Sequence, residues 1–162
     1  MYVGGSTRGN LDGEPNNGGS DAYFTNYNAD GSKQLTRLVG TSAEDFGSII
    51  KPLGDGSLII AGSTKGNLNG QQNHGGDDIF ICKFDNGGEP LWTKLLGTSE
   101  DDSPVGIVAA GNRIYLAGNT KGSFPGQANQ GENDCFIVTL DSNYNPIEVI
   151  QFGTPSNDGI WD

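Results

Sequence analysis

The chain has 162 residues, of which 27 are glycine and 33% are hydrophobic, and its formal net charge at pH 7 is −11. The excess of acidic residues excludes nucleic acid and anionic membrane surfaces as partners, since both require a basic patch. No apolar run approaches the roughly 20 residues that cross a bilayer, so we expect no membrane insertion. The N-terminus lacks the basic segment and apolar stretch of a signal peptide, which fits an initiator Met1 placed on an excised or processed segment.

A glycine-containing motif occurs three times along the chain. Its second glycine is Gly5, Gly62 and Gly118, so the copies are spaced 57 and 56 residues apart. A period in this range is typical of solenoids, propellers and repeat arrays. The three copies of the motif are residues 2–11, 58–68 and 115–124.

Short runs of β-branched and aromatic residues alternate with Gly, Asn and Asp turns in every copy, which predicts strands and hairpins. No segment keeps a helical period over several turns. The predicted strands are residues 2–6, 21–27 and 33–39 in the first repeat, 46–53, 57–63, 78–84 and 90–96 in the second, and 103–110, 113–119, 134–140 and 146–152 in the third. The sequence therefore predicts an all-β protein.

Four-stranded antiparallel units at this period predict the blades of a β-propeller, in which each sheet packs both faces on its neighbours. Burial on both faces accounts for the nearly continuous apolar run at residues 78–84. The predicted repeats are residues 1–45, which lack the first or leading strand, 46–102 and 103–158, while residues 159–162 begin a further leading strand. Residues 1–162 are thus expected to form a single propeller segment with three blade-equivalents.

Three blades cannot close a ring, because propellers have about four to eight blades. Two interpretations remain open. The chain is part of a longer or open array, or two copies form a six-bladed homodimer in which residues 159–162 of one copy complete the first blade of the other. We favour the homodimer.

A sequence pattern shared by the repeats carries a family resemblance. Residues 2–7 read Tyr-Val-Gly-Gly-Ser-Thr, residues 21–24 read Asp-Ala-Tyr-Phe, and residues 40–45 follow Gly-Thr-x-x-x-Asp. The elements recur at 60–64, 78–81 and 97–102, and again near Gly118, Asp134 and Gly153. Over almost its whole length the chain resembles the bacterial β-propeller repeats known as SBBP repeats. The resemblance implies a propeller segment of secreted or surface-attached bacterial and archaeal proteins, hence an extracellular or cell-surface location, and it implies no catalytic site.

Acidic residues recur just outside the predicted strands. A carboxylate at such a place accepts backbone N–H bonds and fixes a turn, so we interpret these residues primarily as structural. The recurring positions are Asp21, Asp78 and Asp134, then Asp45, Asp102 and Asp158, together with the outer-strand ends Gly40-Thr41, Gly97-Thr98 and Gly153-Thr154.

Calcium is the alternative ligand for acids of this kind, because it prefers carboxylate and carbonyl oxygens in tight loops. The candidate ligands are Asp85, in the turn 85–89, and the run Glu100, Asp101 and Asp102, with the turn 28–31 as a further candidate. None of these segments has the spacing and terminal bidentate Glu of a complete calcium loop. No other cofactor is expected, since the sequence has no Cys–His cluster for zinc and no phosphate-binding loop.

Three long polar loops, residues 8–20, 65–77 and 121–133, are predicted to emerge on one face of the propeller. Long loops on a rigid frame are common binding sites, and planar amides suit sugar recognition, although Phe124 is the one aromatic ring in these loops. The simpler interpretation is that the loops cap the blades. The candidate ligand-binding residues are Asn10, Asn16, Asn67, Gln71, Asn73, His74, Gln127 and Asn129.

Catalysis has little support in the sequence. His74 is the single histidine and aligns with Asn17 and Gln130, and Glu44 and Asp45 are adjacent residues whose side chains point apart on a turn. The two cysteines, Cys82 and Cys135, occupy different repeat positions that face opposite ways on a strand, which predicts buried free thiols. We expect a non-enzymatic scaffold or protein-interaction module that self-associates, with a lectin-like propeller that binds a glycan or another ligand as the alternative and a hydrolase as a third option.

Overall fold

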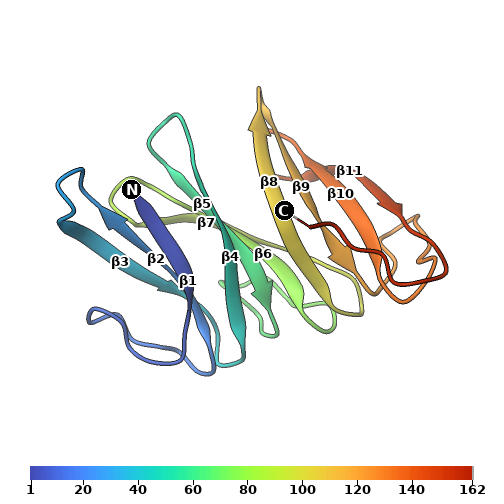
Figure 1. Cartoon of the computed structure of the whole chain (residues 1–162), viewed down its shortest axis with the longest axis horizontal. Coiled ribbons are helices and arrows are strands. Elements are labelled where there is room, and N and C mark those ends of the chain that lie inside the picture. Colours follow the sequence, from blue (N-terminus) through green and yellow to red (C-terminus); the bar gives the residue numbers. More distant parts are fainter. Residues whose placement is uncertain (162) are drawn as a thin grey trace. The chain divides into compact units, whose positions relative to one another are not determined.

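The computed structural model describes residues 1–161, apart from the side chain of Ser48, and the chain divides into two compact units. The first unit comprises Met1–Asn73 and Phe80–Leu95, and the second comprises His74–Ile79 and the chain from Leu96 onward. Within the described residues there are eleven strands and no helix (Figure 1). The predicted all-β class with antiparallel pairing is confirmed. In this part of the chain no helix is long and apolar enough to span a membrane.

The strands form three antiparallel sheets in chain order, each a simple meander. Sheet 1 contains β1 (Tyr2–Thr7), β2 (Asp21–Tyr27) and β3 (Lys33–Val39). Sheet 2 contains β4 (Asp45–Pro52), β5 (Leu58–Thr64), β6 (Asp78–Phe84) and β7 (Pro90–Leu96). Sheet 3 contains β8 (Asp102–Ala110), β9 (Arg113–Thr120), β10 (Asp134–Leu140) and β11 (Pro146–Phe152). Sheet 1 and most of sheet 2 belong to the first unit, and sheet 3 belongs to the second.

Every strand predicted for the three repeats is present, with small differences at the ends. The strands β4 and β8 begin one residue earlier than predicted, because Asp45 pairs with Thr64 and Asp102 pairs with Thr120. Residues 159–161 form no strand in the single chain, and position 162, the end of that predicted strand, lies outside the described residues. A strand requires a hydrogen-bonded neighbour, and this segment instead exchanges two hydrogen bonds between the backbone of Ile160 and the side chain of Asn119.

In the first unit, sheet 2 packs against one face of sheet 1. The side chains of Ala22, Phe24 and Val39 from sheet 1 share one core with Leu58 and Phe80 of sheet 2, and all five are at most 5% exposed. The ring of Phe24 lies edge-on to that of Phe84, with centroids 4.9 Å apart. This core accounts for the close association of β1, β2 and β4 in Figure 1.

Two glycines allow the backbones of sheets 1 and 2 to approach. A Cβ on Gly4 would overlap the side chain of Ile50 and lie 2.7 Å from the carbonyl oxygen of Tyr23. A Cβ on Gly47 would lie 2.8 Å from the carbonyl oxygen of Gly5 and 3.0 Å from Cβ of Ala22. These glycines are therefore required by packing, since any side chain would push the sheets apart.

The central strands of sheet 2 are buried on both faces. Along β5, consecutive residues from Leu58 to Ala61 are at most 1% exposed, and the same holds along β6 from Ile79 to Cys82. Because successive residues on a strand point to opposite faces, apolar contacts cover both sides of this sheet.

Sheet 3 differs, because one of its faces is buried and the other is buried only in part. Leu116, Phe136 and Val138 are at most 1% exposed and point to one side. On the other side, the side chains of Ile150 and Phe152 are 48% and 47% exposed. On this second face Cys135 and Thr139 are only 6% and 4% exposed, so its cover in the described structure is partial.

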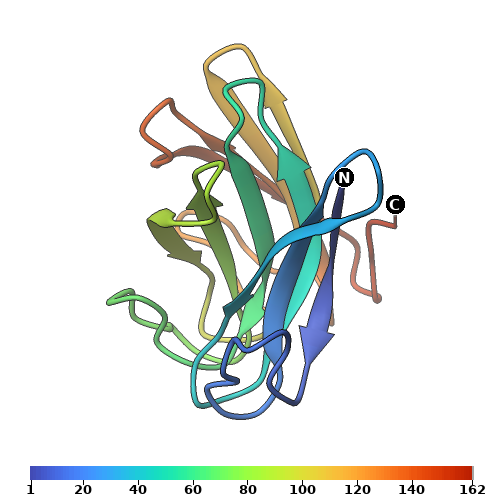
Figure 2. The same ribbon diagram turned by 90° about the vertical axis from the view of Figure 1, so that its left-hand side faces the viewer.

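The short hairpin turns and the long loops lie at opposite ends of the strands. In the first unit, the turns at residues 28–32 and 53–57 lie at the upper end of Figure 2, and the loop 8–20 lies at the lower end. Gly31 and Gly56 have positive φ values of 83° in these turns, a conformation that glycine adopts without steric cost. Both cysteines are free and buried, as predicted, and burial raises the pKa of the Cys82 thiol to about 12.

Candidate functional site

Each long loop is built around a tight turn at an equivalent place. In the first loop Asp12 and Gly13 have φ values of 57° and 89°, and in the second Asn69 and Gly70 have φ values of 49° and 79°. Positive φ at both central residues defines a type I′ turn, which Asp-Gly and Asn-Gly sequences favour. In the third loop Pro125 precedes Gly126, whose φ is 78°, the sequence of a type II turn.

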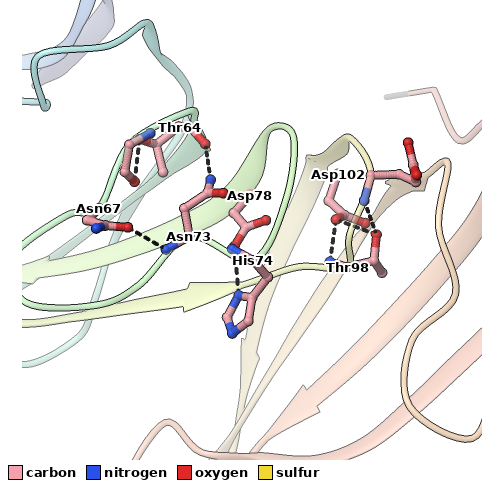
Figure 3. Close-up of polar contacts among 9 residues, drawn as sticks. Thr64, Asn67, Asn73, His74, Asp78, Thr98 and Asp102 are labelled. Atoms are coloured by element: carbon pink, nitrogen blue, oxygen red, sulfur yellow. Dashed lines mark hydrogen bonds and ion pairs between the residues drawn. The ribbon is translucent and has the colours of Figure 1, made fainter.

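The candidate amides brace their own loops. The side-chain nitrogen of Asn73 donates to the carbonyl of Thr64 at 3.0 Å, and the Asn73 N–H donates to Oδ1 of Asn67 at 2.9 Å (Figure 3). Asn16 makes the equivalent bonds to Thr7 and Asn10, at 3.1 and 3.0 Å.

Asn129 repeats the brace in the third loop. It donates to the carbonyl of Lys121 at 2.6 Å, and its N–H donates to Oγ of Ser123 at 2.9 Å. Five of the eight candidate ligand residues, namely Asn10, Asn16, Asn67, Asn73 and Asn129, therefore hold loop geometry in every copy.

The remaining three candidates differ from one another. Gln127 accepts a 3.3 Å hydrogen bond from the N–H of Gln151 through its side-chain oxygen. Gln71 pairs with Leu68 through its backbone, across the loop turn. His74 is exposed, and its Nδ1 lies 2.8 Å from Oδ2 of Asp78 (Figure 3).

The acids that begin β2, β6 and β10 each fix the end of the preceding loop. Oδ2 of Asp21, Asp78 and Asp134 accepts the N–H of the residue four positions earlier, at 2.9 Å in all three cases. In the first two copies the side chain of that earlier residue, Asn17 or His74, contacts the same oxygen. The histidine therefore occupies the place of an asparagine in an otherwise repeated brace.

The acids at the starts of β4 and β8 form a second brace, and Asp158 repeats it. Oδ2 of Asp102 accepts the N–H of Thr98 at 2.6 Å and its hydroxyl at 3.0 Å (Figure 3). Asp45 and Thr41 are joined in the same way at 2.7 and 3.0 Å, and Asp158 and Thr154 at 2.6 and 2.8 Å. Each brace closes the link between consecutive repeats.

The two acids of one repeat approach each other at a glycine. A Cβ on Gly97 would overlap Oδ1 of Asp78 and lie 3.1 Å from Oδ2 of Asp102. Burial raises the pKa of Asp102, the hydrogen bonds from Thr120 and Thr98 oppose the rise, and the charge of Asp78 adds to it.

The first repeat has the same arrangement of acids. Burial raises the pKa of Asp21, and the hydrogen bonds from Asn17 oppose this rise while the charge of Asp45 adds to it. Glycine at positions 40, 97 and 153 is explained by these carboxylates, since a side chain at each would occupy the space of Asp21, Asp78 or Asp134.

Two of the calcium candidates, Asp85 and Asp101, accept hydrogen bonds from protein donors, whereas Oδ1 of Asp102 is buried without a hydrogen-bond partner in the described part of the chain. Oδ1 of Asp85 accepts the N–H groups of Gly87 and Glu89, both at 2.8 Å, and Asp101 accepts the N–H of Asp77 and the ammonium of Lys121. Glu100 donates its own N–H to Thr98. Residues 1–161 contain no group of three or more His, Cys, Asp or Glu side chains arranged to hold a metal.

One residue that the sequence interpretation did not single out is Arg37. Its Nε donates to the carbonyl of Gly88 at 3.0 Å, and its Nη atoms contact Glu14 at 3.1 Å and Glu89 at 3.4 Å. It thus ties β3 to the β6–β7 turn. The third repeat has Ile150 in its place, so the repeat alignment could not reveal this contact.

Two hollows occur in the first unit. A groove of about 230 Å³ is lined by Gly4 and Gly5 of β1 and by Gly47, Ile49 and Ile50 of β4, among others. A second pocket, of about 240 Å³, has a polar side formed by Asn17, Arg37 and Asn69 and an apolar side that includes Val39, Leu68 and Phe84.

Comparison with known proteins gives a similarity that covers nearly the whole chain. No protein-family model matches the chain. The chain is 28% identical over 168 aligned residues to regulatory protein FlaEY of Caulobacter vibrioides, in a match that covers 94% of this chain. The match spans 18% of the length of that protein.

Proposed function

We propose that the chain forms consecutive blades of a β-propeller and acts as a non-enzymatic scaffold or protein-interaction module. The observation that carries the proposal is the face-to-face packing of sheet 2 on sheet 1. In addition, the first residue of β4, Asp45, is hydrogen-bonded to the end of the long loop of sheet 1. The N–H of Asp45 donates to the carbonyl of Ser20 at 2.6 Å. The N–H of Asp102 repeats this bond to Asp77 at 2.6 Å, and that of Asp158 repeats it to Asn133 at 2.8 Å. A link repeated between successive sheets suits a radial array.

A structural rather than catalytic role is supported by the use of the polar residues. The recurrent acids accept bonds within their own loops through Oδ2, and the candidate amides brace the same loops. The second carboxylate oxygen of Asp21, Asp78 and Asp102 is buried, which keeps it away from an external substrate. Recurrence in every repeat also suits a scaffold better than a single active site. We place the chain among SBBP-type repeats of secreted or cell-surface proteins. The similarity to a short stretch of FlaEY supports a module that occurs within longer proteins.

A crystal structure of the chain tests this proposal. We expect successive sheets to pack face to face about a common axis, with β4 and β8 nearest the axis. A sandwich of two sheets, or sheets without mutual contact, would contradict it. Assays on polysaccharide substrates provide the check on catalysis, where we expect no turnover.

A lectin-like function is the second candidate, and the 240 Å³ pocket favours it. Its polar side joins Asn17 and Asn69 from two long loops with the guanidinium of Arg37, and planar amides and guanidinium groups suit sugar hydroxyls. A glycan array tests this candidate. Binding that is lost in Asn69→Ala, with Asn86→Ala in an exposed hairpin turn as the matched control, would favour the lectin over the scaffold.

A further inference from the structure

We propose that a second copy of this chain docks head to tail on the exposed face of sheet 3, through the outer face of its own sheet 1. The inference rests on the blade arrangement proposed above and names the partner of that scaffold. We call the face of sheet 1 that points toward sheet 2 its trailing face, and we give the equivalent face of sheet 3 the same name. In sheet 1 it is defined by Tyr2, Ala22, Phe24 and Val39, and in sheet 3, where it is the docking surface, by Tyr115, Cys135, Ile137 and Phe152.

Equivalent trailing faces have different surroundings in the two sheets. In sheet 1 the residues Ala22, Phe24 and Val39 are at most 5% exposed, because sheet 2 covers them. In sheet 3 the residues Tyr115 and Phe152 are 36% and 47% exposed and Ile137 is half-buried, while Cys135 is 6% exposed, so this face is covered only in part. The repeat itself therefore shows what covers such a face, namely another sheet of the same kind.

The complementary surface is the opposite face of sheet 1, which we call its leading face. In sheet 2 the residues that cover sheet 1 include Ile60, Phe80 and Leu95. Their equivalents in sheet 1 are Val3, Tyr23 and Leu38. Val3 is 43% exposed and the other two are half-buried, so sheet 1 presents apolar side chains at the positions that sheet 2 uses for docking.

The segment after sheet 3 is positioned to take part. The N–H of Ile160 donates to the side chain of Asn119 at 2.8 Å, just as the N–H of Gly47 donates to the side chain of Ser6 at 3.0 Å. The N–H of Asp158 also donates to the carbonyl of Asn133, as the N–H of Asp45 donates to that of Ser20. Residues 158–161 are therefore held next to sheet 3 by the same bonds that hold the start of β4 next to sheet 1.

The edge of β1 provides a matching site. Among the described strands β1 pairs only with β2, and the 230 Å³ groove lies between β1 and β4. The pairing of β4 with β5 predicts the register of the docked segment. Asp158 would lie opposite Thr7 of the second copy, and Ile160 opposite its Gly5.

The contact is heterologous, because two different faces meet, and its repetition can close. Two copies would bring six sheets together, within the range of about four to eight that closes a propeller. Tryptophan at position 161, which is 89% exposed in the single chain, would be covered in such an assembly.

Light scattering across a concentration series of the 162-residue chain is the first measurement. We expect a mass near twice 17.0 kDa at high concentration, falling toward the single-chain mass on dilution. Phe152→Asp on the trailing face and Val3→Asp on the leading face should each weaken association at least about tenfold, because each buries an unpaired charge. Leu91→Asp is the matched control. Leu91 is 54% exposed although sheet 2 packs on sheet 1, so its change should leave association intact.

Mixing the two defective variants tests the head-to-tail geometry. Phe152→Asp keeps an intact leading face and Val3→Asp an intact trailing face, so the mixture should form a complex that neither variant forms alone. A wild-type chain that stays a single copy at every concentration would overturn the inference, as would a Val3→Asp variant that associates like the wild type. Far-ultraviolet circular dichroism and thermal unfolding of the single-copy variants separate a failed docking surface from a failed fold, since cooperative β-sheet unfolding would persist only in the first case.

Discussion

The trailing faces of sheet 1 and sheet 3 are built from equivalent positions and end in opposite environments. In sheet 1 this face lies within a core, with Val39 at 5% exposure, whereas Phe152 at the equivalent position of sheet 3 remains 47% exposed. The amino-acid sequence differs accordingly at one pair of equivalent positions. Arg37 of sheet 1 donates a hydrogen bond to the next sheet, whereas sheet 3 has Ile150 there, which has no such bond. In the first unit sheet 2 covers this face of sheet 1, so the contribution of each residue there to stability depends on the sheet that lies over it.

The largest contrast is expected from truncating equivalent core positions. Phe24→Ala should lower the free energy of unfolding by about 3–5 kcal/mol, because it leaves a cavity between the two sheets. Ile137→Ala, at the equivalent position of sheet 3, should cost less than about 2 kcal/mol under dilute conditions. Urea denaturation followed by circular dichroism measures both. Equal losses would show that the two faces are covered alike in solution.

A second contrast concerns glycines where backbones approach. Gly47→Ala should cost about 1–3 kcal/mol, since the new Cβ would press on the carbonyl of Gly5 and on Ala22. Gly106→Ala on β8 is the control, because a Cβ there would meet nothing within 4 Å. Its stability in the same denaturation experiment should be unchanged or slightly raised. A Gly47→Ala variant as stable as the wild type would show that sheets 1 and 2 do not pack closely.

The hydrogen bonds and ion pairs of Arg37 should contribute less to the free energy of unfolding than the packing contacts above. Arg37→Met keeps much of the apolar stem and removes the bonds to Gly88, Glu14 and Glu89, which should cost about 1 kcal/mol. Arg8→Met is the matched control, because the Arg8 side chain is 76% exposed and its 3.5 Å pair with Glu44 should contribute little. Thermal unfolding of the two variants at low and high salt measures the difference, and equal melting temperatures would contradict the role of Arg37.

The smallest contrast is a pH dependence. Burial raises the pKa of Asp102 in the folded chain above its unfolded value of 3.8, so its contribution to stability is present at low pH and is lost as pH rises through the folded pKa. Asp102→Asn removes this loss, and its melting temperature relative to the wild type should therefore rise from pH 4 upward. Asp158→Asn, which changes the half-exposed equivalent, is the control. A relative melting temperature of Asp102→Asn that stays flat with pH would contradict the assignment.

The strands could be predicted from the sequence because two independent signals agreed. The repeat spacing aligned the copies, and apolar runs such as residues 78–84 together with turn residues such as Gly31 and Gly88 marked the strand ends. The acids Asp45 and Asp102 could be interpreted as turn-fixing residues, since a carboxylate next to a strand end has backbone N–H groups within reach.

The roles of the amides were harder to predict. From the sequence, Asn73 and Asn129 were candidates for binding a sugar, with loops that merely cap the blades as the simpler interpretation. An amide offers the same donors and acceptor to a sugar and to a loop backbone. Only the path of the loop backbone decides, and that path depends on turns such as Asn69-Gly70 that form together with the brace. Arg37 was missed for a related reason, since its partners lie far away in the chain, Glu14 by 23 residues and Gly88 by 51.

The loop braces have a consequence for how such proteins change in length. The Asp and Asn side chains find their partners within about ten residues, as in the 2.9 Å bond from the N–H of Asn17 to Asp21. A duplicated stretch of one period would therefore carry with it nearly every polar contact that its loops require. Gene duplication could then lengthen or shorten the array by whole units, and natural variation in this class should favour gains and losses of complete repeats over insertions within one.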